Sequence, residues 1–201
     1  MIKAVVFDAD GVLINAERFS IQLERAYDIP TERVLPFFTG IFQQCLLGKA
    51  ELKESIEPHL QEWGWKGTTD DLLQFWFQSE HKIDEEVLSI AKALKENLPI
   101  FMATNQEKCR VDYMKSEMGF GSVFAKVYSS AELGHLKTNP EFFNRMIEDM
   151  RGNGLPDIQP NEILFFDDTE ENLESARKFG IQAELYAGIE GFKSRLLELG
   201  L

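Results

Sequence analysis

Residues 5–13 read VVFDADGVL, an apolar run that ends in two aspartates and a glycine. The run begins at Ile2, and residues 2–7 are rich in β-branched side chains, which is typical of a strand buried on both faces. Gly11 indicates a turn directly after it. Asp8 and Asp10 lie two residues apart, so their side chains can lean toward one crevice. This stretch therefore predicts a buried strand that carries a pair of carboxylates at its carboxyl end.

Four further runs resemble this strand, and helical patterns lie between them. The runs cover residues 99–103 (PIFMA), 125–129 (AKVYS), 162–166 (EILFF) and, more weakly, 182–186 (QAELY). Apolar residues at a helical spacing predict helices over residues 107–118, 139–150, 170–179 and 190–199. Strands that alternate with helices in this way predict an α/β fold, with a parallel sheet that is covered by helices on both faces.

The segment between the first two strands breaks this rhythm. Residues 15–82 contain no convincing strand but four helix-like stretches, over residues 16–27, 31–46, 50–63 and 69–80. Glycines separate these stretches, and Pro58 predicts a kink or turn within the third. We therefore expect a core domain of residues 1–14 and 83–201, with a helical domain of residues 15–82 inserted into it.

Polar residues follow the predicted strands at their carboxyl ends, where ligands bind in open parallel sheets. Asp8 and Asp10 follow the first strand, Thr104 and Asn105 the second, and Asp167 and Asp168 the fourth. Lys137 lies before a helix, shortly after the third strand, and the KTNPEFF sequence that it begins distinguishes it from an ordinary solvated lysine. All these positions are expected to converge on one edge of the sheet.

Four carboxylates in one place need compensation. A pair of like charges 4 Å apart costs about 4 kcal/mol at an effective dielectric constant of 20. Either some of the carboxyl groups are protonated, or a divalent cation lies among them. Ligands that are all oxygen favour Mg²⁺, which commonly shares its coordination with a substrate phosphate. Lys137 adds a compact positive charge suited to a phosphoryl group, and Thr104 adds a hydroxyl group.

In this arrangement the chain resembles the haloacid dehalogenase superfamily. The superfamily has an apolar strand followed by DxDG[TV], here VVFDADGVL, and a strand ending in Ser or Thr, here IFMATN. A lysine before a helix, commonly KPxPxxF, corresponds here to LKTNPEFF, which lacks the first proline. A strand that ends in paired acids corresponds to ILFFDDTEENLESA. All four motifs occur in the same order as in the superfamily, and the resemblance implies a Rossmann-like core with a helical cap.

The resemblance also implies roles for the matching residues. Asp8 would be the nucleophile that forms an aspartyl-phosphate, and Asp10 the general acid and then base. Thr104, Asn105 and Lys137 would bind the phosphoryl group. Mg²⁺ would be held by Asp8, the backbone carbonyl of Asp10 and Asp168, with Asp167 as a ligand or as a partner of the ligands. The implied activity is a magnesium-dependent phosphatase that acts on a small phosphorylated metabolite, with a sugar phosphate as the expected substrate.

Several alternatives stay open. A phosphomutase would use the same core and return the phosphoryl group to its substrate. A dehalogenase is disfavoured because dehalogenases of this superfamily usually carry an aromatic residue where Asp10 stands. A non-catalytic binding module is disfavoured because the motif residues are intact. Within residues 15–82, which match the position of the superfamily's mobile cap, the candidates for substrate contact are Phe42, Gln43, Gln44 and Lys49.

Composition excludes other classes of protein. Among 201 residues, 34 are acidic and 21 basic, which gives a formal charge of −13. No cluster of basic residues offers a surface for nucleic acid. Cys45 and Cys109 do not form a metal-binding or disulfide pattern, and we interpret them as free thiols. No run approaches the roughly 18 apolar residues of a membrane span, so we expect a cytoplasmic protein with no membrane partner, and a monomer is compatible with the sequence.

Overall fold

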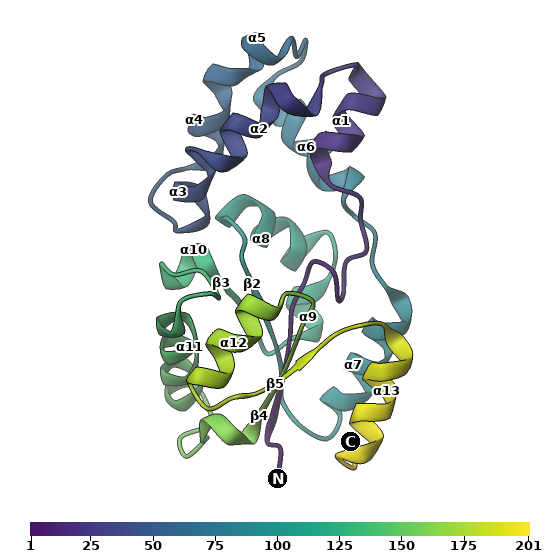
Figure 1. Ribbon diagram of the computed structural model, residues 1–201, viewed down its shortest axis with the longest axis vertical. Helices are drawn as coiled ribbons and strands as arrows, with labels where there is room; N and C mark the ends of the chain where they lie inside the picture. Colours follow the sequence, from purple (N-terminus) through teal and green to yellow (C-terminus); the bar gives the residue numbers. More distant parts are fainter.

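A five-stranded parallel sheet forms the centre of the computed structural model, which describes residues 1–201 (Figure 1). The strand order is β3-β2-β1-β4-β5, so the strand that carries Asp8 lies in the middle. The strands are β1 (Ala4–Phe7), β2 (Ile100–Thr104), β3 (Lys126–Ser129), β4 (Ile163–Asp167) and β5 (Gln182–Leu185). The α/β prediction and all five predicted strands are confirmed, with boundaries that differ by one or two residues.

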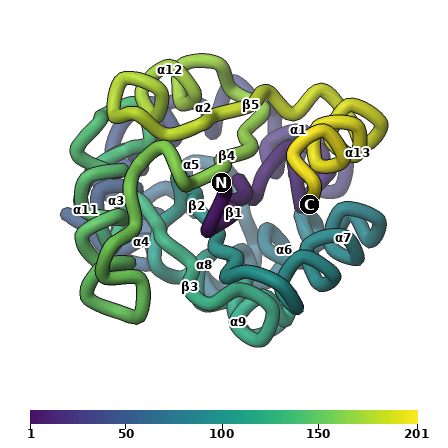
Figure 2. The backbone as a smooth tube through the Cα atoms, turned by 90° about the horizontal axis from the view of Figure 1, so that it is seen from below, coloured from purple at the N-terminus to yellow at the C-terminus, as the bar shows by residue number.

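Alternation along β1 explains the layers of the fold. Val5 and Phe7 face one side of the sheet, where α7 (Glu85–Lys95), α8 (Lys108–Ser116), α9 (Phe120–Val123) and α13 (Ile189–Glu198) cover them. Ala4 and Val6 face the other side, against α10 (Ser130–Leu133), α11 (Pro140–Gly152) and α12 (Glu170–Lys178). Because successive side chains of a strand point to opposite faces, a fully apolar strand must be covered twice. Figure 2 shows the helices on the two sides of the sheet.

The four helices predicted for the core are present as α8, α11, α12 and α13. The sequence analysis missed α7, together with the one-turn helices α9 and α10. Asp84 caps α7 by accepting hydrogen bonds from the backbone N–H groups of Glu86 and Val87. Its buried residues Val87, Leu88, Ala91 and Leu94 have the spacing of one helical face.

Helices alone make up the insertion, as predicted, but two of the predicted stretches are broken. The stretch 31–46 is not one helix: it divides into α2 (Thr31–Thr39) and α3 (Phe42–Leu46) at Gly40, whose φ of −104° and ψ of −114° are not helical. The stretch 50–63 divides into α4 (Leu52–Ile56), a 3₁₀ turn at Glu57–His59 that contains Pro58, and α5 (Leu60–Trp63). The outer members are α1 (Phe19–Tyr27) and α6 (Thr69–Ser79).

The insertion has its own hydrophobic core and two connections to the sheet. Phe37, Trp63 and Trp76 are buried in a cluster that α1 to α6 share. The two connections run side by side, because Ile14 and Ile83 form an antiparallel bridge and Asn15 donates its N–H to the carbonyl of Lys82 at 2.9 Å. Figure 1 shows the helical lobe above the carboxyl ends of the strands. None of the helices is both long enough and apolar enough to cross a lipid bilayer.

Candidate active site

Three of the four predicted carboxylates meet at the carboxyl edge of the central strands. Asp8 follows β1 directly, Asp167 ends β4, and Asp168 comes next. The two strands are in register, with Phe7 opposite Phe166, so their ends lie side by side. Oxygen atoms of Asp8, Asp167 and Asp168 all lie within 4.8 Å of one another. Asp8 and Asp167 are buried, whereas Asp168 is exposed to the space under the helical lobe.

Lys137 reaches into this group from the loop before α11. Its Nζ lies 2.6 Å from Oδ1 of Asp8 and 2.7 Å from Oδ2 of Asp167, and the side chain is almost fully buried. The N–H of Ala9 also donates to Oδ1 of Asp8, at 2.6 Å. Both contacts of Asp8 therefore fall on one oxygen, and Oδ2 has no hydrogen-bond partner within the protein. A carboxylate held by one oxygen and free at the other is suited to nucleophilic attack.

The charges of Asp8, Asp167 and Lys137 interact with one another. Burial raises the pKa of Asp8 well above its usual value of 3.8; Lys137 opposes this effect, while Asp167 and Asp10 add to it. Burial alone would lower the pKa of Lys137, but the carboxylates of Asp8 and Asp167 outweigh it and raise that pKa. Burial and the neighbouring acids thus work against the charged form of Asp8, and Lys137 works in its favour. A further cation beside Asp8 would also favour its carboxylate form.

A glycine makes room for Asp168. Gly11 adopts a φ of +82°, and a Cβ atom at that position would lie 2.0 Å from Oδ2 of Asp168. Both the positive φ and the close approach require a residue without a side chain. The turn after Asp10 and the carboxylate of Asp168 therefore fit together only because residue 11 is glycine.

Asp10 lies at the same edge of the sheet, but its carboxylate belongs to a separate interaction. The side-chain amide of Gln106 donates to Oδ2 of Asp10 at 2.8 Å. The backbone carbonyl of Gln106 in turn accepts from the N–H of Ala131, at 3.3 Å, and so ties this loop to α10. Sequence analysis did not identify Gln106, although its position directly after Thr104 and Asn105 was a usable signal. The contact holds the carboxylate of Asp10 toward the helical lobe.

Thr104 and Asn105 end the neighbouring strand and differ in what they contact. The hydroxyl of Thr104 is buried and has no hydrogen-bond partner within the protein. Buried hydroxyl groups normally have a partner, so this one is available to a ligand. Oδ1 of Asn105 accepts the backbone N–H of Lys137 at 2.8 Å, which fixes the loop that carries the lysine. The side chain of Asn105 thus supports Lys137 in this structure.

The two adjacent acids of β4 differ in how many partners they have. Oδ1 of Asp167 accepts the N–H of Thr169 at 2.8 Å, both of its oxygens accept from Asn172 at 3.1 Å, and Lys137 binds Oδ2. Asp168 accepts only the hydroxyl of Thr169, at 3.0 Å. Asp167 therefore orients Lys137, whereas Asp168 keeps free lone pairs. Sequence analysis missed Asn172, which lies one turn into the helix after the paired acids.

The donor set fits a magnesium ion. Asp8 and Asp168 offer free carboxylate oxygens, and all the available donors are oxygen, as Mg²⁺ prefers. The four acidic residues at this edge face one lysine, so the site is locally negative without a cation. The free oxygen of Asp8 and the effect of burial on its pKa both favour a cation beside this carboxylate. These residues can hold a hard divalent cation beside a carboxylate nucleophile.

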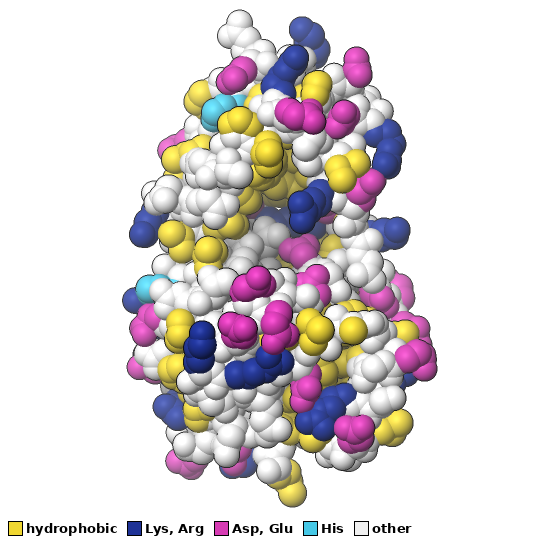
Figure 3. Space-filling view, in the orientation of Figure 1, with side chains coloured by type: hydrophobic (Ala, Val, Ile, Leu, Met, Phe, Trp, Pro, Cys, Tyr) yellow, Lys and Arg dark blue, Asp and Glu magenta, His cyan; other side chains and the backbone are white.

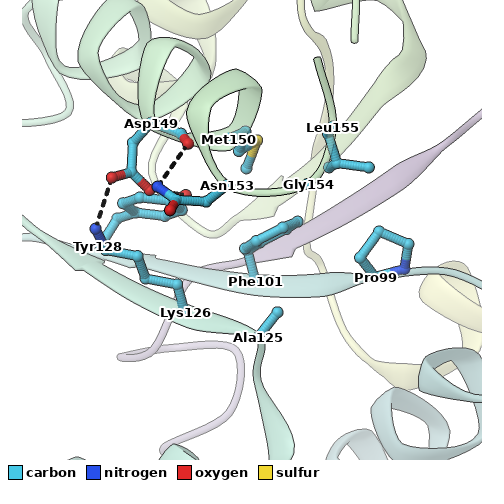
Figure 4. A pocket seen from close by; sticks show the side chains of 10 residues that line it. All are labelled: Pro99, Phe101, Ala125, Lys126, Tyr128, Asp149, Met150, Asn153, Gly154 and Leu155. Atoms are coloured by element: carbon cyan, nitrogen blue, oxygen red, sulfur yellow. Dashed lines mark hydrogen bonds and ion pairs between the residues drawn. The ribbon is translucent and has the colours of Figure 1, made fainter. Parts of the chain in front are cut away.

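A second hollow lies at the opposite edge of the sheet. It has a volume of about 500 Å³ and lies between the starts of β2 and β3 and the end of α11 (Figure 4). Its polar side chains satisfy one another: Asp149 accepts from Lys126 at 3.0 Å and from the hydroxyl of Tyr128 at 2.8 Å. This hollow contains none of the residues that the motifs select. The contacts of Asp149 with Lys126 and Tyr128 join α11 to β3 at this hollow.

Known proteins resemble the chain over most of its length. A curated relative, D-ribitol-5-phosphate phosphatase from Bacteroides thetaiotaomicron, is 27% identical over 193 residues, which cover 90% of each chain. A HAD family enzyme from the same organism, solved as a magnesium complex, superposes with a TM-score of 0.77 at 25% identity and covers 92% of each chain. A HAD-like family hydrolase from Porphyromonas gingivalis gives a TM-score of 0.79 at 26% identity and covers 98% of each chain.

The family itself follows from a match that spans both the core and the insertion. The model of the haloacid dehalogenase-like hydrolases matches residues 2–180, which include all four motifs and every residue of the site. Together with the parallel sheet, the helical insertion and the carboxylates at the strand ends, this match shows that the chain belongs to the haloacid dehalogenase-like hydrolase family.

Proposed function

We propose that the protein is a magnesium-dependent phosphatase that hydrolyses phosphoric monoesters of small metabolites through an aspartyl-phosphate on Asp8. One observation carries the proposal: Asp8 is clamped at Oδ1 by Lys137 and by the N–H of Ala9, while Oδ2 is free at the edge of the sheet. In the first step, Oδ2 of Asp8 attacks phosphorus, and the bond from phosphorus to the ester oxygen breaks. Asp10 gives its proton to the departing alcohol oxygen.

The second step returns Asp8 to its starting state. Asp10, now a carboxylate, takes a proton from a water molecule, whose oxygen attacks phosphorus. The bond between phosphorus and Asp8 breaks, inorganic phosphate leaves, and Asp10 holds the proton for the next cycle. Gln106 supports this role because its amide holds the carboxylate of Asp10, which forms no ion pair with Lys137. Asp10 can therefore exchange protons without being drawn into the ion pair with Lys137.

The phosphoryl group needs donors that match its oxygens. In the proposal Lys137 and the free hydroxyl of Thr104 bind it, and Asn105 acts through the backbone of Lys137. Asp8, Asp168 and the backbone carbonyl of Asp10 would hold Mg²⁺, with Asp167 as a partner that orients Lys137. When bound, Mg²⁺ supplies positive charge that neutralises the phosphate oxygens and lets an anionic ester approach a carboxylate.

The helical insertion acts in this proposal as a cap domain of residues 15–82 on a core domain of residues 1–14 and 83–201. Its separate hydrophobic core and its paired connections at Ile14 and Ile83 support that division. A cap above the carboxyl edge would exclude water from the first step and select the leaving group. A sugar phosphate is the substrate that the resemblance implied, and the curated relative is named as a D-ribitol-5-phosphate phosphatase. The cavity described in the next subsection favours a different leaving group.

A phosphomutase is the second candidate, since the same residues would return the phosphoryl group to an alcohol. Asp10 would serve both reactions, so the support for the phosphatase comes from the exposed side of Asp168, which leaves the site open to water. The intact Asp10 also supports phosphoryl transfer over dehalogenation, because attack on carbon has no need of a general acid. The free Oδ2 of Asp8 supports catalysis over a purely binding role.

Hydrolysis of a generic aryl phosphate tests the proposal. Rates are measured with Mg²⁺ and with EDTA, for the wild-type protein and for Asp8→Asn. We expect turnover that needs Mg²⁺ and falls by at least about 10³-fold in Asp8→Asn. Asp157→Asn, a change on an exposed loop far from the site, serves as the control and should keep the wild-type rate. Turnover that survives Asp8→Asn would contradict the mechanism.

A further inference from the structure

A cavity of about 360 Å³ lies between the helical lobe and the sheet, next to the proton donor of the proposed reaction. Gln106, whose amide binds Asp10, forms part of its wall. The part of a substrate that lies behind the ester oxygen would therefore occupy this cavity when that oxygen faces Asp10. Figure 3 shows the hollow between the two lobes, with hydrophobic side chains along its upper wall.

Aromatic residues make up half of the lining residues that the helical lobe contributes. Phe19, Phe38, Phe42 and Trp76 all line the cavity. The rings contact one another: Phe19 stacks on Trp76 with centroids 4.6 Å apart, and Phe38 meets Trp76 edge to face at 5.4 Å. Of the four residues that the sequence singled out for substrate contact, Phe42 lies here, whereas Gln43, Gln44 and Lys49 are not among the lining residues.

Few polar groups in the wall are available to a ligand. Glu80 already accepts the N–H of Phe19 at 2.8 Å and the indole N–H of Trp76 at 2.9 Å. The side-chain amide nitrogen of Gln106 donates to Asp10, which leaves the carbonyl oxygen of that amide free. Arg18 and Ser20 remain, and neither makes a side-chain hydrogen bond or an ion pair within the protein. A sugar-alcohol chain, with a hydroxyl on each carbon, would place some of its hydroxyl groups against the aromatic rings of the wall.

We infer that the leaving group of the preferred substrate is an alcohol with an aromatic or hydrophobic body, rather than a polyhydroxylated chain. This inference rests on the proposed function, because it assigns the cavity to the alcohol that Asp10 protonates. Buried hydroxyl groups without partners lose their hydrogen bonds to water, whereas an apolar body gains by leaving water and by contact with the rings. The volume is that of a small-molecule pocket and suits one ring or a short branched chain.

Two phosphate esters of primary alcohols distinguish a hydrophobic leaving group from a polyhydroxylated one. 2-Phenylethyl phosphate and ribitol 5-phosphate are both esters of primary alcohols, so neither has the intrinsic reactivity of an aryl phosphate. With Mg²⁺ present, we expect kcat/KM for the phenylethyl ester to exceed that for the ribitol ester by about tenfold or more. Equal values, or a preference for the ribitol ester, would overturn the inference while leaving the phosphatase intact.

Variants of the wall test whether the cavity is the source of the preference. Leu35 and Phe38 line it, and Leu35 is half exposed, so Leu35→Asn should fold normally even if Phe38→Asn does not. Each change should reduce the ratio of the two kcat/KM values by at least about fivefold. Leu197→Asn, at an exposed leucine of α13, is the control and should leave the ratio unchanged. Unchanged ratios in the Leu35 and Phe38 variants would overturn the inference.

Binding without turnover separates this inference from the proposed function. Asp8→Asn protein is titrated with each ester while tryptophan fluorescence is recorded, since Trp76 lies in the wall. We expect tighter binding of the phenylethyl ester, with a change in emission. If the wild-type protein hydrolyses neither these esters nor the aryl phosphate, the proposed function fails, and the titration still shows which leaving group the cavity binds. Tighter binding of the ribitol ester would overturn the assignment.

Discussion

At the scale of single residues, the four acids of the site differ in their hydrogen-bond and ion-pair partners. Asp8 and Asp167 share Lys137, Asp168 is free toward the solvent side, and Asp10 is held by Gln106. Four chemically identical side chains thus receive different partners from different elements of the fold. Environment, rather than residue type, separates a nucleophile from a proton donor.

Asp10→Asn is expected to lower hydrolysis of an alkyl phosphate by about 10²–10⁴-fold, because an amide cannot protonate the leaving oxygen. For p-nitrophenyl phosphate, whose leaving group needs little protonation, the first step should survive while attack by water stays slow. Rapid-mixing measurements should then show a burst of nitrophenolate equal to the amount of enzyme, followed by slow release. Equal losses for both esters, with no burst, would contradict the role of Asp10.

At the scale of elements, the contact between the helical lobe and the core depends on Gly48. It has a φ of +67°, and a Cβ atom there would lie 2.3 Å from the carbonyl oxygen of Ala131 in α10. The loop between α3 and α4 therefore approaches the core more closely than any other residue type permits. Because the cavity wall belongs to the same lobe, a shift at this contact should reach the substrate.

Gly48→Ala is expected to lower kcat/KM by at least about tenfold, since a displacement of about 1 Å can cost as much as 100-fold. Gly119→Ala is the matched control: Gly119 has a φ of +74°, with nothing within 4 Å of the added Cβ atom. Both changes carry the strain of a positive φ, about 1–2 kcal/mol, which urea unfolding should show. Normal activity in Gly48→Ala would show that this contact does not position the lobe.

Another contact between elements joins β3 to α11, through Asp149 (Figure 4). Burial alone would raise the pKa of Asp149, but hydrogen bonds from Lys126 and Tyr128 outweigh burial and hold it below its usual value of 3.8. A carboxyl group with a lowered pKa stabilises the fold above its unfolded pKa, and this stability is lost as the pH falls through the folded pKa.

Asp149→Asn should therefore lower the free energy of unfolding by about 1 kcal/mol at pH 7, from the lost hydrogen bonds. The difference from the wild-type protein should shrink as the pH falls from 5 toward 3, because Asp149 itself becomes protonated. Urea unfolding at several pH values measures this. Asp157→Asn should show no comparable effect, as its side chain lies exposed in a loop. A deficit that stays constant down to pH 3 would exclude the ionised contact.

Strand ends were the most predictable elements of the site. Apolar runs followed by Asp, Thr or paired acids identify both the strands and the residues that meet at their carboxyl edge. The interruption at Pro58 was predicted and is confirmed by the 3₁₀ turn at Glu57–His59. The break within residues 31–46 was not predicted, because the break at Gly40 reflects how the lobe packs around Phe37 and Phe42. Gln106 was missed because its partner Asp10 lies 96 residues away in the sequence, whereas Asn172 lies five residues after its partner Asp167 and could have been identified. The α7 helix likewise had a capping aspartate and a clear apolar spacing, and could have been identified.

At the scale of the whole molecule, an acidic chain is expected to bind an anion. The formal charge is −13, and the four acids of the site add locally to the negative potential. Close to Asp8 the local potential would become positive, through Lys137, the hydroxyl of Thr104 and a bound divalent cation. This change would extend over a few ångströms only. The helical lobe lies above this small region (Figure 1), so we expect the substrate to be recognised locally, without a broad positive surface.

The central claim is that Asp8 becomes phosphorylated. Enzyme mixed with an aryl phosphate and Mg²⁺ is quenched in acid within one turnover, digested, and analysed by mass spectrometry; Asp10→Asn protein, in which the intermediate should accumulate, is treated in the same way. We expect the mass of one phosphoryl group on the peptide that contains Asp8, and none in Asp8→Asn protein or in the presence of EDTA. A phosphoryl group on another residue, or its absence from Asp10→Asn protein that still releases phenolate, would contradict the account.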